Sequence, residues 1–496
     1  MTRQFLLTTA FAALITTPAL ADLTAQDVWA EWQAIAANSG YTLMAGAQSQ
    51  SGDTLTVSEV TMSIALPEGT MVGQLGDIAF TERGDGTVAV VLPEEYPLVF
   101  SGTNADGAEF ETTLTLTHDG LEMIASGEPG RTLHTYGAAS IGMAGDAFEA
   151  DGEVMPMDLE LTMSQVAGEY EVVAGTPMAV RSDLTAVGVA VAFAASDPEG
   201  SGDVASLTAT LSDLVSTSSG TMSSFSAMAG LAEMIGQGLS SEAQLSYRDA
   251  SYQIAGTSEG ETFEMIATAV QGELAVSVGE NGVSYSGRNQ EMTLAAAGSQ
   301  VPVPNLNLAM DSSSWRFEMP LTVSDEPQDF AILLRFDGLT ASDAIWSMFD
   351  PAGALPRDPA TLVVDLGGTG KWYVDITDPA MAETPFEGAP GEVQSLSVNE
   401  LRLGMVGAEL TGTGDFTFDN ATMPPVPVGA IDLQLVGGNG LIDRLVSMGA
   451  LPQEQAMGAR MMLGLFARPG GGDDTLTSRI EFTPQGGIIA NGQPLR

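Results

Sequence analysis

The sequence predicts a mainly β protein with a few helices (a β-rich α+β fold), built as a long antiparallel meander or a curved, elongated sheet. Apolar residues make up 44% of the 496 residues, which is too many for a disordered chain. They recur with period two in many segments, and short polar or glycine-containing turns separate these segments. Only four stretches show helical spacing instead, so strands are expected to dominate.

The strand prediction depends on alternation. Apolar residues occupy every second position in 60–66 and in 155–163. Segments 274–278 and 283–285 flank the sequence Gly-Glu-Asn-Gly at 279–282, which is a typical hairpin turn. Segment 306–310 is expected to lead through the polar residues 311–314 into a strand at 315–321. Further strands are expected at 110–117, 184–193, 243–255, 331–337, 361–376, 396–410 and 429–436.

The four predicted helices cover residues 24–37, 224–237, 340–350 and 440–466. Thr24 and Asp27 have the spacing of a capping pair at the start of the first helix. Thr340 is expected to begin the third helix, and the sequence Asp350-Pro351 to end it. The last stretch is interpreted as a helical hairpin because Gly449 and a proline three residues later interrupt it.

The predicted organisation is a signal peptide at 1–21, an N-terminal half at 22–220 and a C-terminal half at 221–496. The soft boundary between the halves lies in the Ser/Thr/Gly-rich stretch 216–226, and one continuous unit is the alternative. Residues 23–29 and 339–346 have similar sequences. This similarity indicates either an internal duplication or two helices that converged on the same capping chemistry, and we favour convergence.

The N-terminus predicts export. Arg3 precedes an apolar stretch too short for the roughly 20 residues that span a bilayer, and Pro18 and Ala19 lead to a small residue at the cleavage position. We therefore expect cleavage after Ala21 and a periplasmic protein. No transmembrane helix is expected in the mature chain, because the uncharged stretch 214–232 consists mostly of Ser, Thr, Gly and Ala.

Composition excludes several classes of function. The chain has no cysteine, which rules out disulfides, lipoprotein anchors and thiolate metal sites. It has 16 basic and 64 acidic residues and a net charge of −48. Such a surface repels nucleic acid and anionic lipid headgroups. The acidic residues are scattered, as expected for a well-solvated surface.

No motif for catalysis, a cofactor or a metal stands out, so we predict no catalytic, cofactor-binding or metal-binding residue and no cofactor. His118 and Asp119 are interpreted as turn residues and His134 as a strand residue, because they lack the spacing of metal ligands. Segment 367–371 lacks the spacing of a phosphate-binding loop. The acidic loops 197–203 and 470–474 are interpreted as solvated turns, with weak calcium binding as the alternative.

The chain contains 25 methionines, many of them on apolar strand and helix faces. Most are expected to fill the core, where methionine adapts to irregular gaps. The alternative is a pliable apolar groove that accepts acyl chains or varied partners. The methionines concerned are Met155, Met157, Met163, Met319, Met461 and Met462.

Three segments resemble a bacterial family known as domain of unknown function 2125. They are the opening Leu-Thr-Ala-Gln-Asp-Val-Trp at 23–29, the segment 345–360, which contains Asp350 and Pro351, and the ending 480–495. The resemblance implies an exported protein with no assigned activity. The closing Asn-Gly-Gln-Pro-Leu at 491–495 more loosely resembles periplasmic β-rich proteins of the AsmA-like kind, which would imply a role in envelope assembly or lipid traffic.

Taken together, these features predict a periplasmic, non-enzymatic protein that binds a lipid or an envelope protein on an apolar sheet face. Two alternatives stay open at this point. An outer-membrane β-barrel fits the alternation and acidity, although the terminal Arg496 and the lack of aromatic girdles oppose it. A carboxylate-dependent hydrolase fits the inventory of acidic residues, although nothing selects a pair of them.

Overall fold

A computed structural model describes residues 22–495, apart from 67–68, 104–106, 198–201, 223–230, 302, 304–305, 379–388 and 423. The predicted signal peptide therefore lies outside the described residues. The chain is mainly β, as predicted, and every pairing between its named strands is antiparallel.

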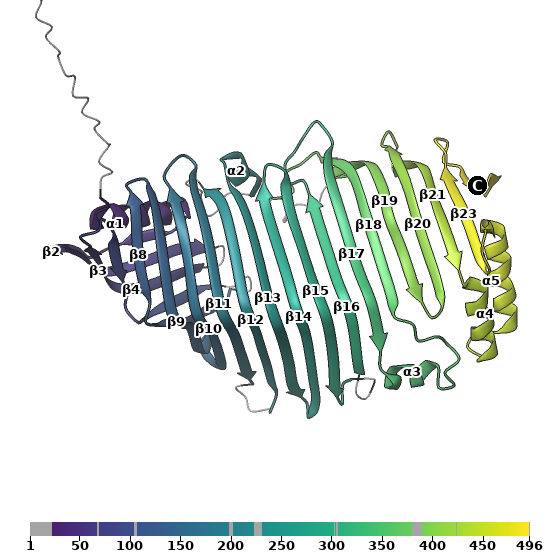
Figure 1. Cartoon of the computed structure of the whole chain (residues 1–496), viewed down its shortest axis with the longest axis horizontal. Helices are drawn as coiled ribbons and strands as arrows, with labels where there is room; N and C mark the ends of the chain where they lie inside the picture. The colour runs from purple at the N-terminus through teal and green to yellow at the C-terminus, as the bar shows by residue number, and fades with distance from the viewer. Residues whose placement is uncertain are drawn as a thin grey trace, which may run out of the picture.

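The centre of the molecule is a meander in which each strand pairs with the next one along the chain. Its members are long and lie side by side (Figure 1). They are β9 (Arg131–Ala150), β10 (Glu153–Val173), β11 (Met178–Ser196), β12 (Val204–Met222), β13 (Ser240–Ser258), β14 (Glu261–Gly279), β15 (Gly282–Gly298), β16 (Leu306–Met319), β17 (Gln328–Ala341), β18 (Ala360–Trp372), β19 (Gly391–Met405), β20 (Ala408–Asp419) and β21 (Val426–Val436).

The sheet divides at its N-terminal end. Between β4 and β9, one half of the sheet is filled by β5 and β8 and the other half by β6 and β7. Beyond β4, β3 pairs with both β1 and β2. The bounds are β1 (Thr42–Met44), β2 (Ala47–Ser51), β3 (Thr54–Leu66), β4 (Gly69–Glu82), β5 (Val88–Val91), β6 (Glu95–Thr103), β7 (Glu109–Asp119) and β8 (Glu122–Glu128).

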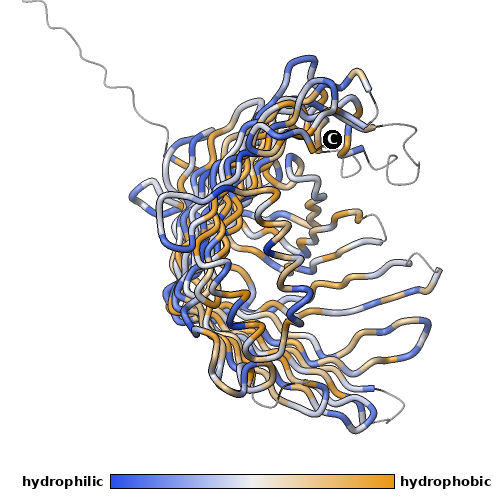
Figure 2. Tube along the Cα trace, turned by 90° about the vertical axis from the view of Figure 1, so that its right-hand side faces the viewer, coloured by the Kyte–Doolittle hydropathy of each residue, from blue (hydrophilic) through white to orange (hydrophobic). Residues whose placement is uncertain are grey.

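The C-terminal end is completed by short strands and two helices. β23 pairs with β21, and the short strands β22, β24 and β25 continue the pairing. Viewed along its long axis, the sheet has a C-shaped profile that is open on one side (Figure 2). The bounds are β22 (Arg468–Pro469), β23 (Thr475–Phe482), β24 (Ile488–Ala490) and β25 (Gln493–Pro494).

The helices largely follow the sequence prediction. α1 (Ala25–Asn38) begins with the predicted capping box of Thr24 and Asp27. α2 (Leu231–Gly236) falls within the predicted helix 224–237, whose first seven residues lie outside the described chain. The predicted hairpin at 440–466 is formed by α4 (Gly438–Ser447) and α5 (Gln453–Phe466). In the part of the chain that the structure describes, no helix combines the length and apolar character needed to cross a membrane.

The prediction that Thr340 begins the third helix is wrong. α3 (Asp343–Phe349) starts later and has Ser342 as its N-cap. Thr340 is still part of β17, pairs with Ala309 of β16 and donates a hydrogen bond from its hydroxyl to the Ala309 carbonyl at 3.3 Å. Strand pairing therefore outweighs the local capping signal.

The hydrophobic core of the N-terminal end lies under α1. Leu23, Val28 and Trp29 are buried against residues of β3, β4, β5 and β8, which include Val57 and Phe80. The end of the helix reaches β11 and β12, where Ser39 Oγ lies 3.4 Å from Met222 Sδ. α1 therefore covers the apolar face of the sheet at this end of the molecule.

The apolar pattern of β10–β17 shifts phase at one level of the sheet. Apolar residues follow period two on either side, but at this level successive inward residues are three apart, as with Met163 and Val166 in β10 or Leu211 and Leu214 in β12. These residues pack in one cluster, so they share a face. Positive φ values mark the same level at Gln165, Asp213, Asp249, Glu291 and Gly338. The strand pairing skips Gln165 and Glu291 without changing the register on either side. The positive φ values bend the strands locally, which is consistent with the C-shaped profile.

Strand pairing is continuous across the predicted boundary between the halves, because β12 pairs with β13 along most of its length. The sheet crosses the predicted boundary without interruption. Whether the two halves fold as separate units stays a prediction.

Candidate functional site: an apolar groove on the inner face

One face of the sheet carries rows of apolar side chains that cross many strands. The register places Val276, Tyr285, Phe317 and Ile332 opposite one another on β14, β15, β16 and β17. The row continues on the following strands through Leu366, Val398, Gly414, Ile431, Ile480 and Ala490. Because side chains alternate between faces, this register gives the sheet one apolar side.

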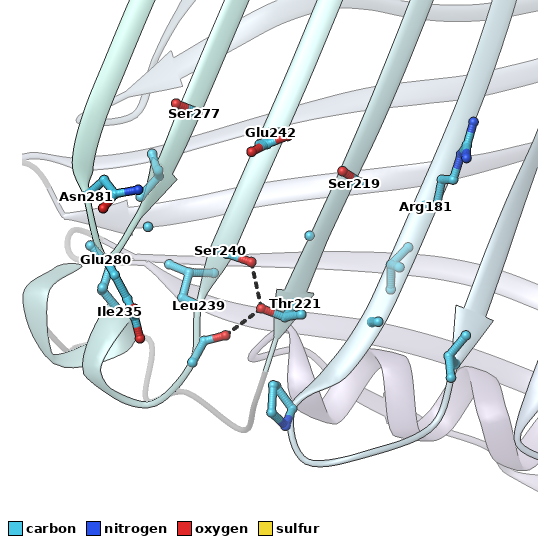
Figure 3. Close-up of a pocket in the computed structure, with 18 of the residues that line it drawn as sticks. Arg181, Ser219, Thr221, Ile235, Leu239, Ser240, Glu242, Ser277, Glu280 and Asn281 are labelled. Atoms are coloured by element: carbon cyan, nitrogen blue, oxygen red, sulfur yellow. Dashed lines mark hydrogen bonds between the residues drawn. The ribbon is translucent and has the colours of Figure 1, made fainter. Parts of the chain in front are cut away.

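The other face of the sheet is polar. Its arginines pair across strands with carboxylates, as Arg335 does with Glu400 at 2.6 Å and Arg479 with Asp432 at 2.5 Å. Figure 3 looks onto this face, with Arg181, Ser219 and Glu242 on the viewer's side and the N-terminal strands passing behind the sheet. The polar face is therefore the outer one, and the apolar rows line the inside of the C-shaped profile.

The apolar face contains a groove of about 490 Å³ on β15–β19. Apolar side chains from all five strands line it, and several are well exposed although they are large: Tyr285 by 43%, Phe317 by 42%, Met319 by 39% and Val393 by 42%. The apolar lining residues are Val283, Tyr285, Phe317, Met319, Pro320, Phe330, Ile332, Trp372, Pro390 and Val393. A volume in this range is typical of sites for small molecules.

Two sets of polar groups at the edge of the groove are already paired. Trp372 Nε1 donates a hydrogen bond to the carbonyl of Pro320 at 2.8 Å. Lys371 borders the groove together with Glu392, and these two side chains form an ion pair of 3.2 Å. The groove therefore offers contact area to an apolar ligand without demanding a polar partner.

Glycines opposite aromatic residues form part of the apolar face. A Cβ atom at Gly287 would lie 2.7 Å from the indole ring of Trp315, and one at Gly368 would lie 2.6 Å from the ring of Phe330. Both contacts are far closer than van der Waals distance, so each ring lies directly over its glycine. Aromatic rings over strand glycines keep such a face covered by apolar atoms.

The outer face carries a second, polar depression of about 740 Å³ near the ends of β10–β14 (Figure 3). Arg181, Glu242 and Ser219 lie in it, and the hydroxyl of Thr221 bonds Ser240 Oγ at 2.7 Å. Arg181 pairs with Asp183 at 3.4 Å. Opposite charges are mixed and mutually paired here, so this depression selects no class of ligand.

The histidines do not form a shared site. The interpretation of His118 and Asp119 as turn residues is wrong, because both belong to β7 and pair with β9. His118 pairs with Ile141, whereas His134 lies seven residues earlier on that strand. His134 is fully buried, and its Nε2 lies 2.7 Å from Glu31 Oε1 of α1. Among the described residues, no group of three or more His, Asp or Glu side chains is placed to hold a metal ion.

Of the acidic loops, 197–203 lies largely outside the described residues, and 470–474 has a structural role. The Asp474 carboxylate accepts hydrogen bonds from the backbone N–H groups of Asn439 at 3.1 Å and Gly440 at 2.8 Å, at the start of α4. Burial raises the pKa of this carboxyl, but these hydrogen bonds outweigh burial and hold the pKa below its usual value.

The structure places some of the methionines in the core and others on exposed apolar surfaces. Met163 packs in the inner cluster around Val166, as expected of a core residue. Met319 lines the groove, and Met461 and Met462 are exposed on α5. Sequence reasoning placed Tyr285, Phe317 and Ile332 in strands but did not assign them to a ligand site, because alternation alone does not say which apolar face stays uncovered.

Comparison with known families adds one finding. Residues 239–484 match the model of a family described as an uncharacterized protein conserved in bacteria (DUF2125). This segment is similar to the DUF2125 family. The match confirms the resemblance predicted from the sequence over a region that includes segment 345–360 and leaves out segment 23–29. The matched region begins at the start of β13 and includes every strand of the groove. No curated protein matches the chain.

Proposed function

We propose that this protein is an exported, non-enzymatic protein of the bacterial envelope that binds the acyl chains of lipids on its inner apolar face. The observation that carries the proposal is the groove between β15 and β19, where Tyr285, Phe317 and Met319 are exposed to solvent on one apolar surface. Large uncovered apolar patches on a folded protein indicate a binding surface.

Hydrocarbon is the ligand chemistry that best fits this surface. Each buried methylene group contributes about 0.8 kcal/mol, and an acyl chain has no polar atoms that need partners. A peptide would bring N–H and C=O groups to a mostly apolar face that offers them few hydrogen-bond partners. The apolar rows extend beyond the groove along β14–β24, which suits an elongated ligand.

The cellular location in this proposal rests on the sequence. The signal-like segment 1–21 and the absence of cysteine support an exported protein that works in the periplasm. The net charge of −48 supports a role that involves neither nucleic acid nor a phosphate-rich partner.

The test is native mass spectrometry combined with lipid extraction, on protein purified from a periplasmic fraction without detergent. We expect co-purified lipid in the wild type. Phe317→Glu places a charge in the groove and should lower the retained lipid about tenfold or more, since burying an unpaired carboxylate is costly.

Ser286→Glu is the matched control. Ser286 belongs to the same strand as Tyr285 but lies on the outer face, opposite Arg316, so a new carboxylate there finds a basic partner. Its lipid content should equal that of the wild type. A lipid-free wild type that also fails to take up fatty acid probes would overturn the proposal, and so would equal lipid loss in both variants.

A further inference from the structure

α5 exposes an apolar stripe to solvent. Met457, Met461, Met462 and Leu465 are 60%, 72%, 49% and 50% exposed. Three of them are spaced four residues apart, so they lie on one side of the helix. We call these four residues the methionine stripe. An ordinary surface helix shows its polar face to solvent, and α5 does the opposite here.

The remaining faces of α5 are occupied. Ala456 is buried, and Arg460 forms an ion pair with Asp443 of α4. The two helices stand together at the C-terminal end of the sheet (Figure 1), where α4 packs against β20. Nothing in the described part of the chain covers the methionine stripe.

The charge around the stripe differs from that of the rest of the molecule. Residues 438–469, which comprise α4, α5 and β22, contain two acidic residues, Asp443 and Glu454, and three basic ones, Arg444, Arg460 and Arg468. The whole chain has a net charge of −48. An anionic bilayer therefore does not repel the surface of this hairpin, although it repels the rest of the molecule.

We propose that the methionine stripe inserts into the interfacial region of a lipid bilayer and brings the C-terminal end of the sheet to the membrane. This inference rests on the proposed function, because it supplies the route by which acyl chains reach the inner apolar face. A helix that lies in the bilayer interface buries one apolar side and keeps its charges in water, which is the arrangement of α5.

The stripe fits a bilayer better than a protein partner. Four partly exposed side chains present on the order of a few hundred Å², less than the roughly 800 Å² per partner of a stable protein interface. The stripe has no Trp, Tyr or unpaired Arg, the residues that anchor protein interfaces. Methionine and leucine carry no hydrogen-bond donors, so they enter hydrocarbon without an unpaired donor.

The experiment is vesicle flotation of the full mature protein with phosphatidylcholine vesicles. We expect the wild type to float with the vesicles and Met461→Glu to partition at least about tenfold more weakly, a change that corresponds to roughly 1.4 kcal/mol. Added phosphatidylglycerol should weaken wild-type binding through the acidic surface.

Met348→Glu is the matched control. Met348 is 61% exposed on α3, so the same substitution removes a comparably exposed methionine from a helix outside the hairpin of α4 and α5. It should float like the wild type. Failure of the wild type to float, equal losses in both variants, or a dimer that Met461→Glu dissociates would each overturn the inference.

The groove variant separates this inference from the proposed function. Phe317→Glu should float like the wild type while losing its retained lipid. Flotation that depends on Met461 in a protein that never retains lipid would refute acyl-chain binding and leave the membrane contact standing. Lipid retention without flotation would refute the membrane contact alone.

Discussion

Glu31, in the middle of α1, contacts His134 of β9, with Oε1 and Nε2 2.7 Å apart. Tyr170 of β10 stacks on the imidazole ring at a centroid distance of 4.3 Å, and Thr132 donates a hydrogen bond to the same carboxylate. Burial first, and then the Glu31 carboxylate, raise the pKa of the Tyr170 hydroxyl. These contacts fix α1 on the inner face, where it covers the end of the apolar surface.

His134→Ala should therefore destabilise the N-terminal end of the sheet. It removes a fully buried ring and leaves the Glu31 carboxylate with one partner fewer. We expect a loss of about 2–4 kcal/mol in the free energy of unfolding, measured by urea denaturation. The control is Glu171→Gln, which breaks the exposed ion pair with Arg131 and should cost less than about 1 kcal/mol. Equal effects of the two substitutions would contradict the importance of the buried contact.

Gly287→Ala should disturb the floor of the apolar face. Its Cβ would lie 2.7 Å from the Trp315 ring, so the ring must move. We expect a loss of about 1–3 kcal/mol and a change in the near-ultraviolet circular dichroism of the tryptophan. Gly404→Ala is the control, because its Cβ would meet no atom closer than 3.9 Å. If both variants match the wild type in stability and in circular dichroism, the close packing of Trp315 on Gly287 is not required for stability.

The positive φ at position 291 predicts which residues this position accepts. Glu291 has φ 49, and a β-branched residue is strained in that region. Glu291→Val should lower the free energy of unfolding by about 1–2 kcal/mol, whereas Glu291→Gly should stay within about 1 kcal/mol of the wild type. Thr293→Val, on the same strand and exposed, is the control and should cost less than about 1 kcal/mol. A harmless Glu291→Val would argue against a positive φ at this position in solution.

Period-two alternation predicted most strands, and the capping pair Thr24 and Asp27 predicted α1. Besides the start of α3, two further strand boundaries were wrong for the same reason. The residues 311–314, expected as a link between strands, lie within β16, and the expected strand 396–410 is two strands joined by a turn at Val406 and Gly407. In both places tertiary pairing decided what local polarity could not. The three-residue spacing between inward apolar residues could be seen in single strands of the sequence. That these spacings lie at one level of the sheet became clear only from the pairing of neighbouring strands.

The groove was predictable only in part. The sequence indicated an apolar sheet face and named Met319, but a strand shows two faces and the sequence does not say which is covered. α1 covers this face at one end, and beyond it Tyr285 and Phe317 stay exposed. That difference follows from the length of α1 and the curvature of the sheet, and both are properties of the assembled fold.

The loop after α3 should lose its order in acid. The Asp350 carboxylate accepts hydrogen bonds from the backbone N–H groups of Leu355 at 2.8 Å and Ala354 at 2.9 Å, beneath a loop at the molecular surface. The hydrogen bond from Leu355, opposed by desolvation and aided by Ala354 and Arg357, lowers the pKa of this carboxyl. Because the folded-state pKa is the lower one, the stabilisation is complete above the unfolded value of about 4 and is lost as the pH falls through the folded value.

Hydrogen exchange at the Leu355 amide should therefore lose its protection below about pH 4, beyond the intrinsic pH dependence of exchange. Asp350→Asn should remove this pH dependence and weaken the protection at neutral pH, while Asp358→Asn, in the same segment, should change neither. Protection at Leu355 that stays constant down to pH 2 in the wild type would contradict the role of the Asp350 carboxylate.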